Sequence, residues 1–287
     1  MALPRLVLAV IGDEIGPSLG EMISFCAEND VRRLDMRTLG GRNLLGMDLS
    51  EIRDIRRVLD DAGIAIPTYV SPLLKWPAPG QGPANGKVDF AFDPASCPVP
   101  DPVAHAFDIA AIFGARRMRI FSHLRYAGYA PQDLMPAIEQ LLVLARQHDV
   151  ILEMENEPVC SVGSIAELAA FFAWLPQPLL SYLRPLVDIG NSWSMGLPPG
   201  DADIALLSAS VDQIHLKDRD TTARRTVPLG DGDVPWSAEL RRLLAGVTRP
   251  EVIASIETHC PQDGRHATAR SVAALRRIAD EIGVEVI

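Results

Sequence analysis

The sequence predicts a single domain over residues 1–287 with the α/β fold of a closed (β/α)8 barrel, the TIM barrel. Segments rich in Val, Ile and Leu recur along the chain with helical stretches between them, as in a parallel sheet whose crossovers are helices. A doubly wound open sheet would show the same alternation with fewer strands. No GxGxxG follows the first predicted strand, where a dinucleotide-binding sheet usually has one, so the barrel is favoured.

The predicted strands are short apolar runs that end at polar or turn residues, as expected for strands buried in a parallel sheet. The first, LVLAVI, stops at Gly12 and Asp13. In chain order the eight predicted strands lie at residues 6–11, 31–36, 64–70, 116–121, 150–155, 186–188, 213–216 and 252–257.

The helices predicted between the strands have recognisable start signals. Asp101 followed by Pro102 provides a capping oxygen and then a residue with a preset φ. Ser164 with Glu167 forms a capping box ahead of an apolar run. The same reasoning places further helices at residues 17–28, 50–62, 131–148, 203–209, 237–244 and 265–282. The long stretch rich in Pro and Gly at residues 72–102 is predicted to be a functional loop over the barrel mouth.

Charge and composition exclude several classes of protein. The 27 Lys and Arg against 37 Asp and Glu give a net charge of −10, which disfavours binding to nucleic acid or an anionic membrane. The apolar run near the start is far shorter than the ~20 residues of a membrane helix and is not flanked like a secretory signal. Four scattered cysteines without a CxxC pair favour a reducing, cytoplasmic setting. A homo-oligomer is left open.

Four predicted strands end in side chains that can bind a metal ion. Glu155 closes ILEME, Asp188 closes LVD, His215 lies in QIHLKD and Glu257 closes VIASIE. The active sites of such barrels lie at the carboxyl ends of the strands, so these groups should converge. Each alone is more often a helix cap or an ion-pair partner, but four together would repel one another without a cation. Three carboxylates and one imidazole suit Mn2+, Mg2+, Co2+ or Zn2+.

These residues resemble the xylose isomerase-like barrels, which comprise sugar phosphate isomerases and epimerases, keto-inositol dehydratases and endonuclease IV. The marks are the step Glu155–Asn156, VDIGN around Asp188, HLKD from His215, PLGDGDVPW at residues 228–236 and the final Glu257. The resemblance covers nearly the whole chain. It implies that Glu155, Asp188, His215 and Glu257 bind one divalent metal.

Three amino-terminal marks are similar to a branch described only as sugar phosphate isomerases or epimerases. They are GDEI with Glu14, LDMR with Arg37 and SPLLK with Lys75, each at a predicted strand end. The resemblance implies that these three side chains bind substrate, although a strand-end arginine can simply pair with Glu14 or another carboxylate. His123, Asn156, Asn191 and Lys217 are further candidates for substrate binding.

The chain departs from the family at positions that bear on the number of metals. Asn191 stands where epimerases and endonuclease IV-like chains often have a histidine, and the GDGD run has Asp231 and Asp233 without one. A trinuclear zinc site needs more histidines than this, so we expect one metal. His259 lies two residues after Glu257 and should face the same side of a continued strand.

The predicted chemistry is proton abstraction next to a carbonyl through an enediolate, with a small carbohydrate as substrate. A metal that chelates the carbonyl and a neighbouring hydroxyl makes this proton acidic enough to remove. Glu155 and Glu257, expected on opposite sides of the ring, would exchange the proton from two faces and so isomerise or epimerise the sugar. Lys217 can act as an acid if burial lowers its pKa. A lyase or dehydratase, a phosphodiesterase acting on abasic DNA, and a catalytically silent barrel are the alternatives.

Overall fold

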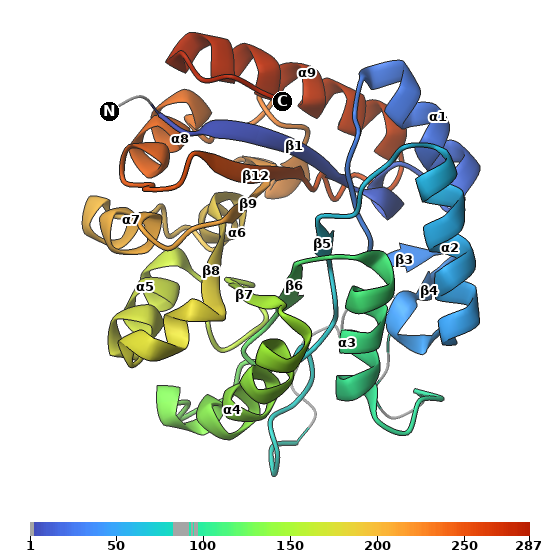
Figure 1. Cartoon of the computed structure of the whole chain (residues 1–287). Coiled ribbons are helices and arrows are strands. Elements are labelled where there is room, and N and C mark those ends of the chain that lie inside the picture. Colours follow the sequence, from blue (N-terminus) through green and yellow to red (C-terminus); the bar gives the residue numbers. More distant parts are fainter. Residues whose placement is uncertain (1–2, 83–91, 93, 95–96) are drawn as a thin grey trace.

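The computed structural model describes residues 3–82, 92, 94 and 97–287, and within them eight parallel strands form a nearly closed barrel surrounded by helices (Figure 1). The barrel strands are β1 (Arg5–Ile11), β2 (Leu34–Asp35), β5 (Thr68–Tyr69), β6 (Arg117–Ile120), β7 (Ile151–Glu155), β8 (Leu183–Asp188), β9 (Gln213–Leu216) and β12 (Glu251–Ile256). Their order in the sheet is β2-β1-β12-β9-β8-β7-β6-β5. Isolated bridges from Arg33 to Ala65 and from Met36 to Tyr69 join β2 to β5. The predicted fold class is therefore confirmed.

The helices begin and end within two residues of the six predicted ranges. Both predicted start signals are also confirmed, since the side chain of Asp101 caps α3 and Ser164 with Glu167 forms the capping box of α5. The helices are α1 (Leu19–Asn29), α2 (Leu49–Asp61), α3 (Pro102–Phe113), α4 (Pro131–His148), α5 (Ile165–Trp174), α6 (Ile189–Ser194), α7 (Asp201–Ser208), α8 (Trp236–Ala245) and α9 (Gly264–Ile282), with 3-10 turns at Gly12–Glu14, Leu44–Gly46 and Gln177–Ser181.

The second and third predicted strands are longer than those observed. Only Leu34 and Asp35 pair with β1, and beyond them β2 meets β5 through the two isolated bridges, so a continuous ladder does not form there. Two antiparallel hairpins at the mouth were not predicted. They are β3 (Thr38–Leu39) with β4 (Arg42–Asn43), and β10 (Asp218–Asp220) with β11 (Arg225–Val227). In the predicted mouth loop, residues 83–91, 93 and 95–96 lie outside the described part of the chain.

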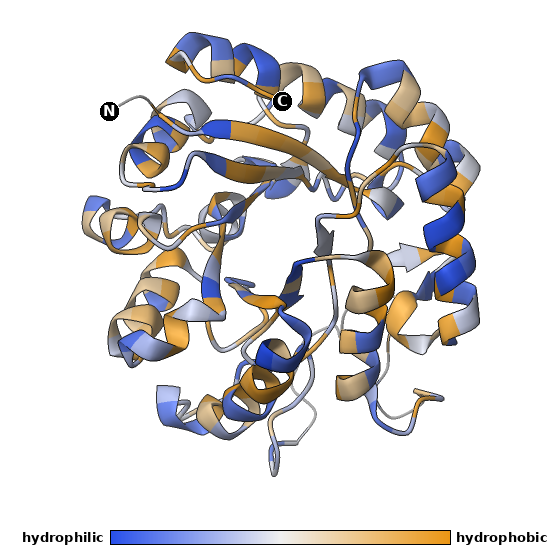
Figure 2. Cartoon of the chain, viewed as in Figure 1, coloured by the Kyte–Doolittle hydropathy of each residue, from blue (hydrophilic) through white to orange (hydrophobic). Residues whose placement is uncertain are grey.

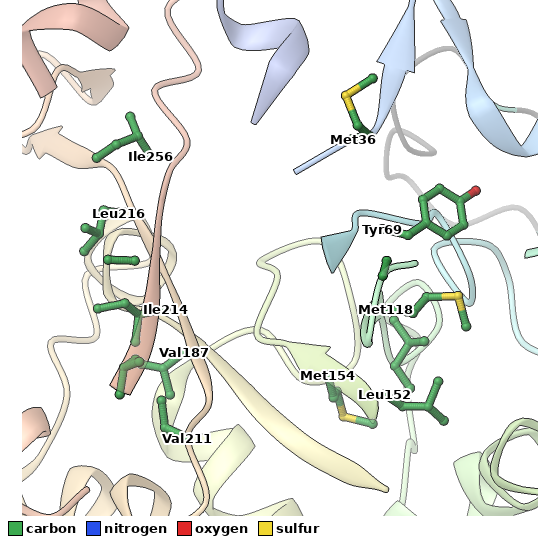
Figure 3. Packing of buried hydrophobic residues seen from close by; sticks show 14 of the residues in the cluster. Met36, Tyr69, Met118, Leu152, Met154, Val187, Val211, Ile214, Leu216 and Ile256 are labelled. Atoms are coloured by element: carbon green, nitrogen blue, oxygen red, sulfur yellow. The ribbon is translucent and has the colours of Figure 1, made fainter. Parts of the chain in front are cut away.

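Along β6, β7 and β9, alternation places apolar side chains on the outside of the barrel and polar ones in its interior, whereas β1 is apolar on both faces. Figure 3 shows Leu152, Met154, Ile214 and Leu216 in the apolar packing around the barrel. The hydropathy colouring agrees, because β1 and β12 are largely hydrophobic while hydrophilic residues recur along the outer helices (Figure 2). Since successive side chains point to opposite faces, the residues between these apolar positions point into the barrel. Ligand candidates at strand ends are thus held by a large apolar core.

A polar layer crosses the barrel interior below the strand ends. Gln213 accepts a hydrogen bond from Thr68 Oγ1 at 2.6 Å and donates through Nε2 to Ser255 Oγ at 2.8 Å and to Asp35 Oδ2 at 2.9 Å. Gln213 and Ser255 lie two residues before His215 and Glu257, so the layer braces the strands that present these groups. Among the described helices, none has the length and apolarity to span a membrane.

Candidate metal centre

The four strand-end candidates converge on one buried point. Glu155, Asp188, His215 and Glu257 each offer a ligand atom, and these atoms all lie within 4.8 Å of one another. The exposed fraction of each residue is 1% or less. His215 Nδ1 lies 3.2 Å from Glu155 Oε1 and 3.4 Å from Glu257 Oε2, so the imidazole stands between the two glutamates.

Backbone and amide contacts fix the direction of Asp188. This residue ends β8 and caps α6, because its Oδ1 accepts the N–H of Asn191 at 2.7 Å. Asn156 clamps the same turn: its Nδ2 donates to the carbonyl of Asp188 at 2.8 Å, and its Oδ1 accepts the N–H of Asp188 at 2.9 Å. Asn191 in turn donates to the carbonyl of Asn156 at 2.8 Å. Both asparagines therefore hold the frame of the site.

Lys217, which follows β9, reaches the same point. Its Nζ lies 2.8 Å from Asp188 Oδ2 and 2.6 Å from Glu257 Oε2. Burial alone would lower the pKa of Lys217, but the carboxylates of Asp188 and Glu257 outweigh it and raise that pKa. The condition under which this lysine would act as an acid is therefore not met.

The charges in the cluster hold the two glutamates ionised. Burial opposes ionisation, yet His215 and Arg119 hold the pKa of Glu155 at about 2, and Lys217, with the two nearby histidines, holds that of Glu257 well below its usual range. Burial raises the pKa of Asp188 to about 6 against the pull of Lys217. The two glutamates, despite the burial of the imidazole, raise the pKa of His215 to about 10.

Arg37 joins the amino-terminal candidates to this cluster. Its guanidinium donates to Glu257 Oε1 at 2.9 Å, to Glu14 Oε1 at 2.9 Å and to Asp13 at 3.1 Å. Glu14 also accepts from Thr258 Oγ1 at 2.8 Å. The pairing of Arg37 with Glu14, considered as an alternative from the sequence, is thus present. Asp13 was missed, although it adjoins Glu14 directly after the first strand.

Arg119 is a second neighbour of the cluster that was not predicted from the sequence. Its Nη1 donates to Glu155 Oε2 at 3.2 Å, and its guanidinium stacks 4.4 Å from the centre of the Phe121 ring. The signal was present in the alternation of RMRIF, which points Arg119 into the barrel. Lys75 lies over the same ring, with its Nζ 4.8 Å from the ring centre and 3.2 Å from Glu157.

Two histidines at the mouth have left-handed backbone conformations, which are strained for a non-glycine residue. His123, with φ 58°, contacts the carbonyl of Trp76 through Nδ1 at 3.2 Å, and burial lowers its pKa. His259, with φ 49°, places Nε2 3.1 Å from Glu257 Oε1, as its position two residues on suggested. His259 also lines a cavity of about 680 Å3 together with Arg225 and Arg270. The four clustered side chains do not line this cavity, and His259 is the lining residue that contacts one of them, Glu257.

The GDGD run is structural. Asp218 accepts the backbone N–H groups of Gly230 at 2.9 Å and Val234 at 3.2 Å, so the run wraps around this carboxylate. Asp231 pairs with Arg270, and Asp233 accepts the N–H of Thr221 at 2.7 Å. Asp218 thus joins the HLKD segment to the GDGD run, and Asp231 and Asp233 are engaged in contacts of their own, outside the metal-ligand cluster.

The donor set fits one divalent cation. Hard carboxylate oxygens and one imidazole nitrogen are common ligands of such ions, and burial of three carboxylates favours a cation among them. His215 Nε2 has no hydrogen-bond partner among the described residues, while Nδ1 faces the two glutamates. A second group, Glu14, Glu257 and His259, is also close enough for an ion. Arg37 already supplies a positive charge to both of those glutamates.

Solved structures share this fold at low sequence identity. A D-tagatose 3-epimerase-like protein is 13% identical with a TM-score of 0.70, covering 97% of this chain and 98% of its own. The probable 3-DHS dehydratase AsbF from Bacillus anthracis is 15% identical with a TM-score of 0.66, covering 95% and 98%. The IOLI protein with a zinc atom is 12% identical with a TM-score of 0.71, covering 96% and 99%. The chain spans 43% of a longer fusion of a xylose isomerase-like TIM barrel with 4-hydroxyphenylpyruvate dioxygenase.

At the level of sequence, no curated protein matches the chain. A family model described as the xylose isomerase-like TIM barrel matches residues 23–278. This match takes in seven of the eight barrel strands, all except β1, and includes the four converging side chains. The chain therefore belongs to the xylose isomerase-like TIM barrel family.

Proposed function

We propose that the protein is a divalent-metal-dependent isomerase or epimerase of a sugar or sugar phosphate. The observation that carries this proposal is the convergence of Glu155, Asp188, His215 and Glu257 within 4.8 Å, with two ionised glutamates in one buried cluster. Its fold neighbours include a D-tagatose 3-epimerase-like protein and a zinc-bound structure, which supports both the reaction class and the cation.

Glu155, Asp188, His215 and Glu257 would hold the ion. When bound, the ion would polarise a carbonyl and so make the proton on the neighbouring carbon more acidic. Glu155 and Glu257 remove and return the proton, since both carboxylates are ionised at neutral pH. Their strands are separated by β8 and β9, so they stand three places apart in the ring and not opposite each other. The glutamates still flank His215 from two sides.

The remaining candidates position the substrate or the groups that act on it. In this proposal Glu14, Arg37 and Lys217 orient hydroxyl or phosphate oxygens, and Asn156 and Asn191 keep Asp188 aligned. Lys75 and His123, which follow β5 and β6, would contact the substrate from that part of the mouth. The cavity beside His259, at about 680 Å3, has the volume of a small-molecule pocket and would admit the substrate.

A lyase is the second candidate, because the same enolate can expel a β-hydroxyl group. The similarity of the fold to the probable dehydratase AsbF supports this alternative. A phosphodiesterase is disfavoured by the net charge of −10 and by Asn191 in place of a histidine.

The test is a panel of ketoses, ketose phosphates and keto-inositols incubated with protein and Mn2+, with products identified by NMR. We expect at least one epimer or isomer, whose formation stops with a chelator and in His215→Gln but not in the control His148→Gln on the exposed surface of α4. Dehydration products would favour the lyase. Incision of an abasic duplex, or no conversion of any compound, would contradict the proposal.

A further inference from the structure

The ammonium group of Lys217 lies where the cluster would hold a cation. Its Nζ is 2.8 Å from Asp188 Oδ2 and 2.6 Å from Glu257 Oε2, and these residues are two of the four metal-ligand candidates. Only 3% of the residue is exposed, so solvent does not screen these contacts. The lysine therefore neutralises the same carboxylates that a divalent ion would need.

The two oxygens that Lys217 contacts are not the ones that the surrounding frame of the site binds. Asp188 Oδ1 accepts the N–H of Asn191 at 2.7 Å, which leaves Oδ2 facing the lysine. Glu257 Oε1 accepts from Arg37 at 2.9 Å and lies 3.1 Å from His259 Nε2. Glu257 Oε2 faces the lysine and, at 3.4 Å, His215 Nδ1, which is itself a ligand candidate. An ion that binds both residues through these oxygens has to displace the ammonium group of Lys217 from them.

The position of the lysine stem is built into the backbone. A Cβ atom at Gly190 would lie 2.6 Å from Lys217 Cγ and 2.7 Å from the Lys217 carbonyl oxygen, closer than real Cβ contacts. The first turn of α6 thus approaches the stem in a way that only glycine permits. The backbone of α6 at Gly190 therefore packs against the Lys217 stem and holds it beside the cluster.

We propose that Lys217 is a resident cation of the site, which competes with the divalent metal for Asp188 and Glu257. This inference rests on the metal dependence in the proposed function. An ammonium group and a divalent ion that contact the same pair of oxygens repel each other strongly in a buried site. Metal binding therefore moves Nζ off these carboxylates, and the freed ammonium becomes a hydrogen-bond donor for an oxygen of the substrate. Metal binding precedes productive substrate binding in this scheme.

The experiment is calorimetric titration of Mn2+ into the full-length wild-type protein and the variant Lys217→Met, which keeps an unbranched stem but removes the charge. We expect the Kd for Mn2+ to fall about tenfold or more in the variant, equivalent to about 1.4 kcal/mol. Damage to the fold would weaken metal binding, so a tighter Kd cannot arise from damage. The matched control Lys75→Met removes a buried lysine that pairs with Glu157 and should leave the Kd unchanged.

Two further variants keep the inference testable if Lys217→Met does not fold. Lys217→Gln should also tighten Mn2+ binding and increase the rise in Tm that Mn2+ produces, whereas Lys217→Arg, which keeps the charge, should not. An unchanged or weaker Kd in the neutral variants, or a tighter Kd in Lys217→Arg, would overturn the competition while leaving the metal site intact. Absence of Mn2+ binding in every protein would instead overturn the proposed function and this inference with it.

Discussion

Asp35 in the polar layer below the site is expected to destabilise the folded protein at neutral pH. The side chain is fully buried and accepts hydrogen bonds through Oδ2 from Ser255 Oγ and Gln213 Nε2. Burial, only partly offset by the Ser255 hydroxyl and by nearby positive charge, raises its pKa from 3.8 to about 6. The variant Asp35→Asn keeps an oxygen for both donors and removes the charge.

The size of the effect follows from this pKa. Between 3.8 and about 6, at about 1.4 kcal/mol for each pH unit, the ionised form costs the folded state about 3 kcal/mol. Because the folded pKa lies above the unfolded value, the contribution of protonated Asp35 is complete below about pH 4. It is lost as the pH rises through about 6. Wild type should therefore lose about 3 kcal/mol relative to Asp35→Asn between pH 4 and pH 7.

Urea unfolding of both proteins at half-unit pH steps measures this difference directly. The free energies of unfolding should be similar near pH 4 and should separate as the pH rises, with Asp35→Asn the more stable protein at pH 7. The surface variant Asp54→Asn, at a residue whose side chain is 72% exposed, should follow wild type. Parallel profiles for wild type and Asp35→Asn, or a less stable variant at pH 7, would show that ionised Asp35 does not destabilise the folded protein.

Three further outcomes follow from the contacts in the site. Protein purified without chelator should contain about one divalent ion per chain by elemental analysis, and three ions would contradict a mononuclear site. Asn156→Ala removes both hydrogen bonds to the backbone of Asp188 and should lower the free energy of unfolding by about 2 kcal/mol, against no change if the turn holds itself. Arg119→Met leaves Glu155 buried beside a lost partner and should cost about 3 kcal/mol in chemical unfolding, whereas a neutral effect would show that His215 alone suffices.

Much of the barrel is predictable from the sequence because most of its strands are rich in apolar residues and end at polar or turn residues. Residues 150–155 and 252–257 match β7 and β12 to within one residue at each end. The second and third strands could not be bounded in this way. Their lengths depend on how many backbone pairs form between β2 and β5 where the barrel closes. This number is set by the tertiary structure and not by local residues such as Val31 and Ile64.

In the candidate site, the strand-end residues were predictable from the sequence and their contacts were not. Glu155, Asp188, His215 and Glu257 were predictable because a polar residue that ends an apolar strand has little alternative to the barrel mouth. The partners of these residues were not, since Arg119 contacts Glu155 from the neighbouring strand and nothing in either segment specifies the pairing. The raised pKa of Lys217 likewise depends on two carboxylates far away in the chain.

In the proposed reaction a buried glutamate removes a proton from a carbon next to a carbonyl, and solvent deuterium incorporation at that carbon measures this step. In D2O with Mn2+ and the panel compound that reacts fastest, wild type should incorporate deuterium. Glu257→Gln should do so about a hundredfold more slowly, because the amide cannot act as a base. The control Glu239→Gln, at a buried glutamate of α8, should keep the wild-type rate. Exchange by Glu257→Gln at the wild-type rate would show that Glu257 is not the base.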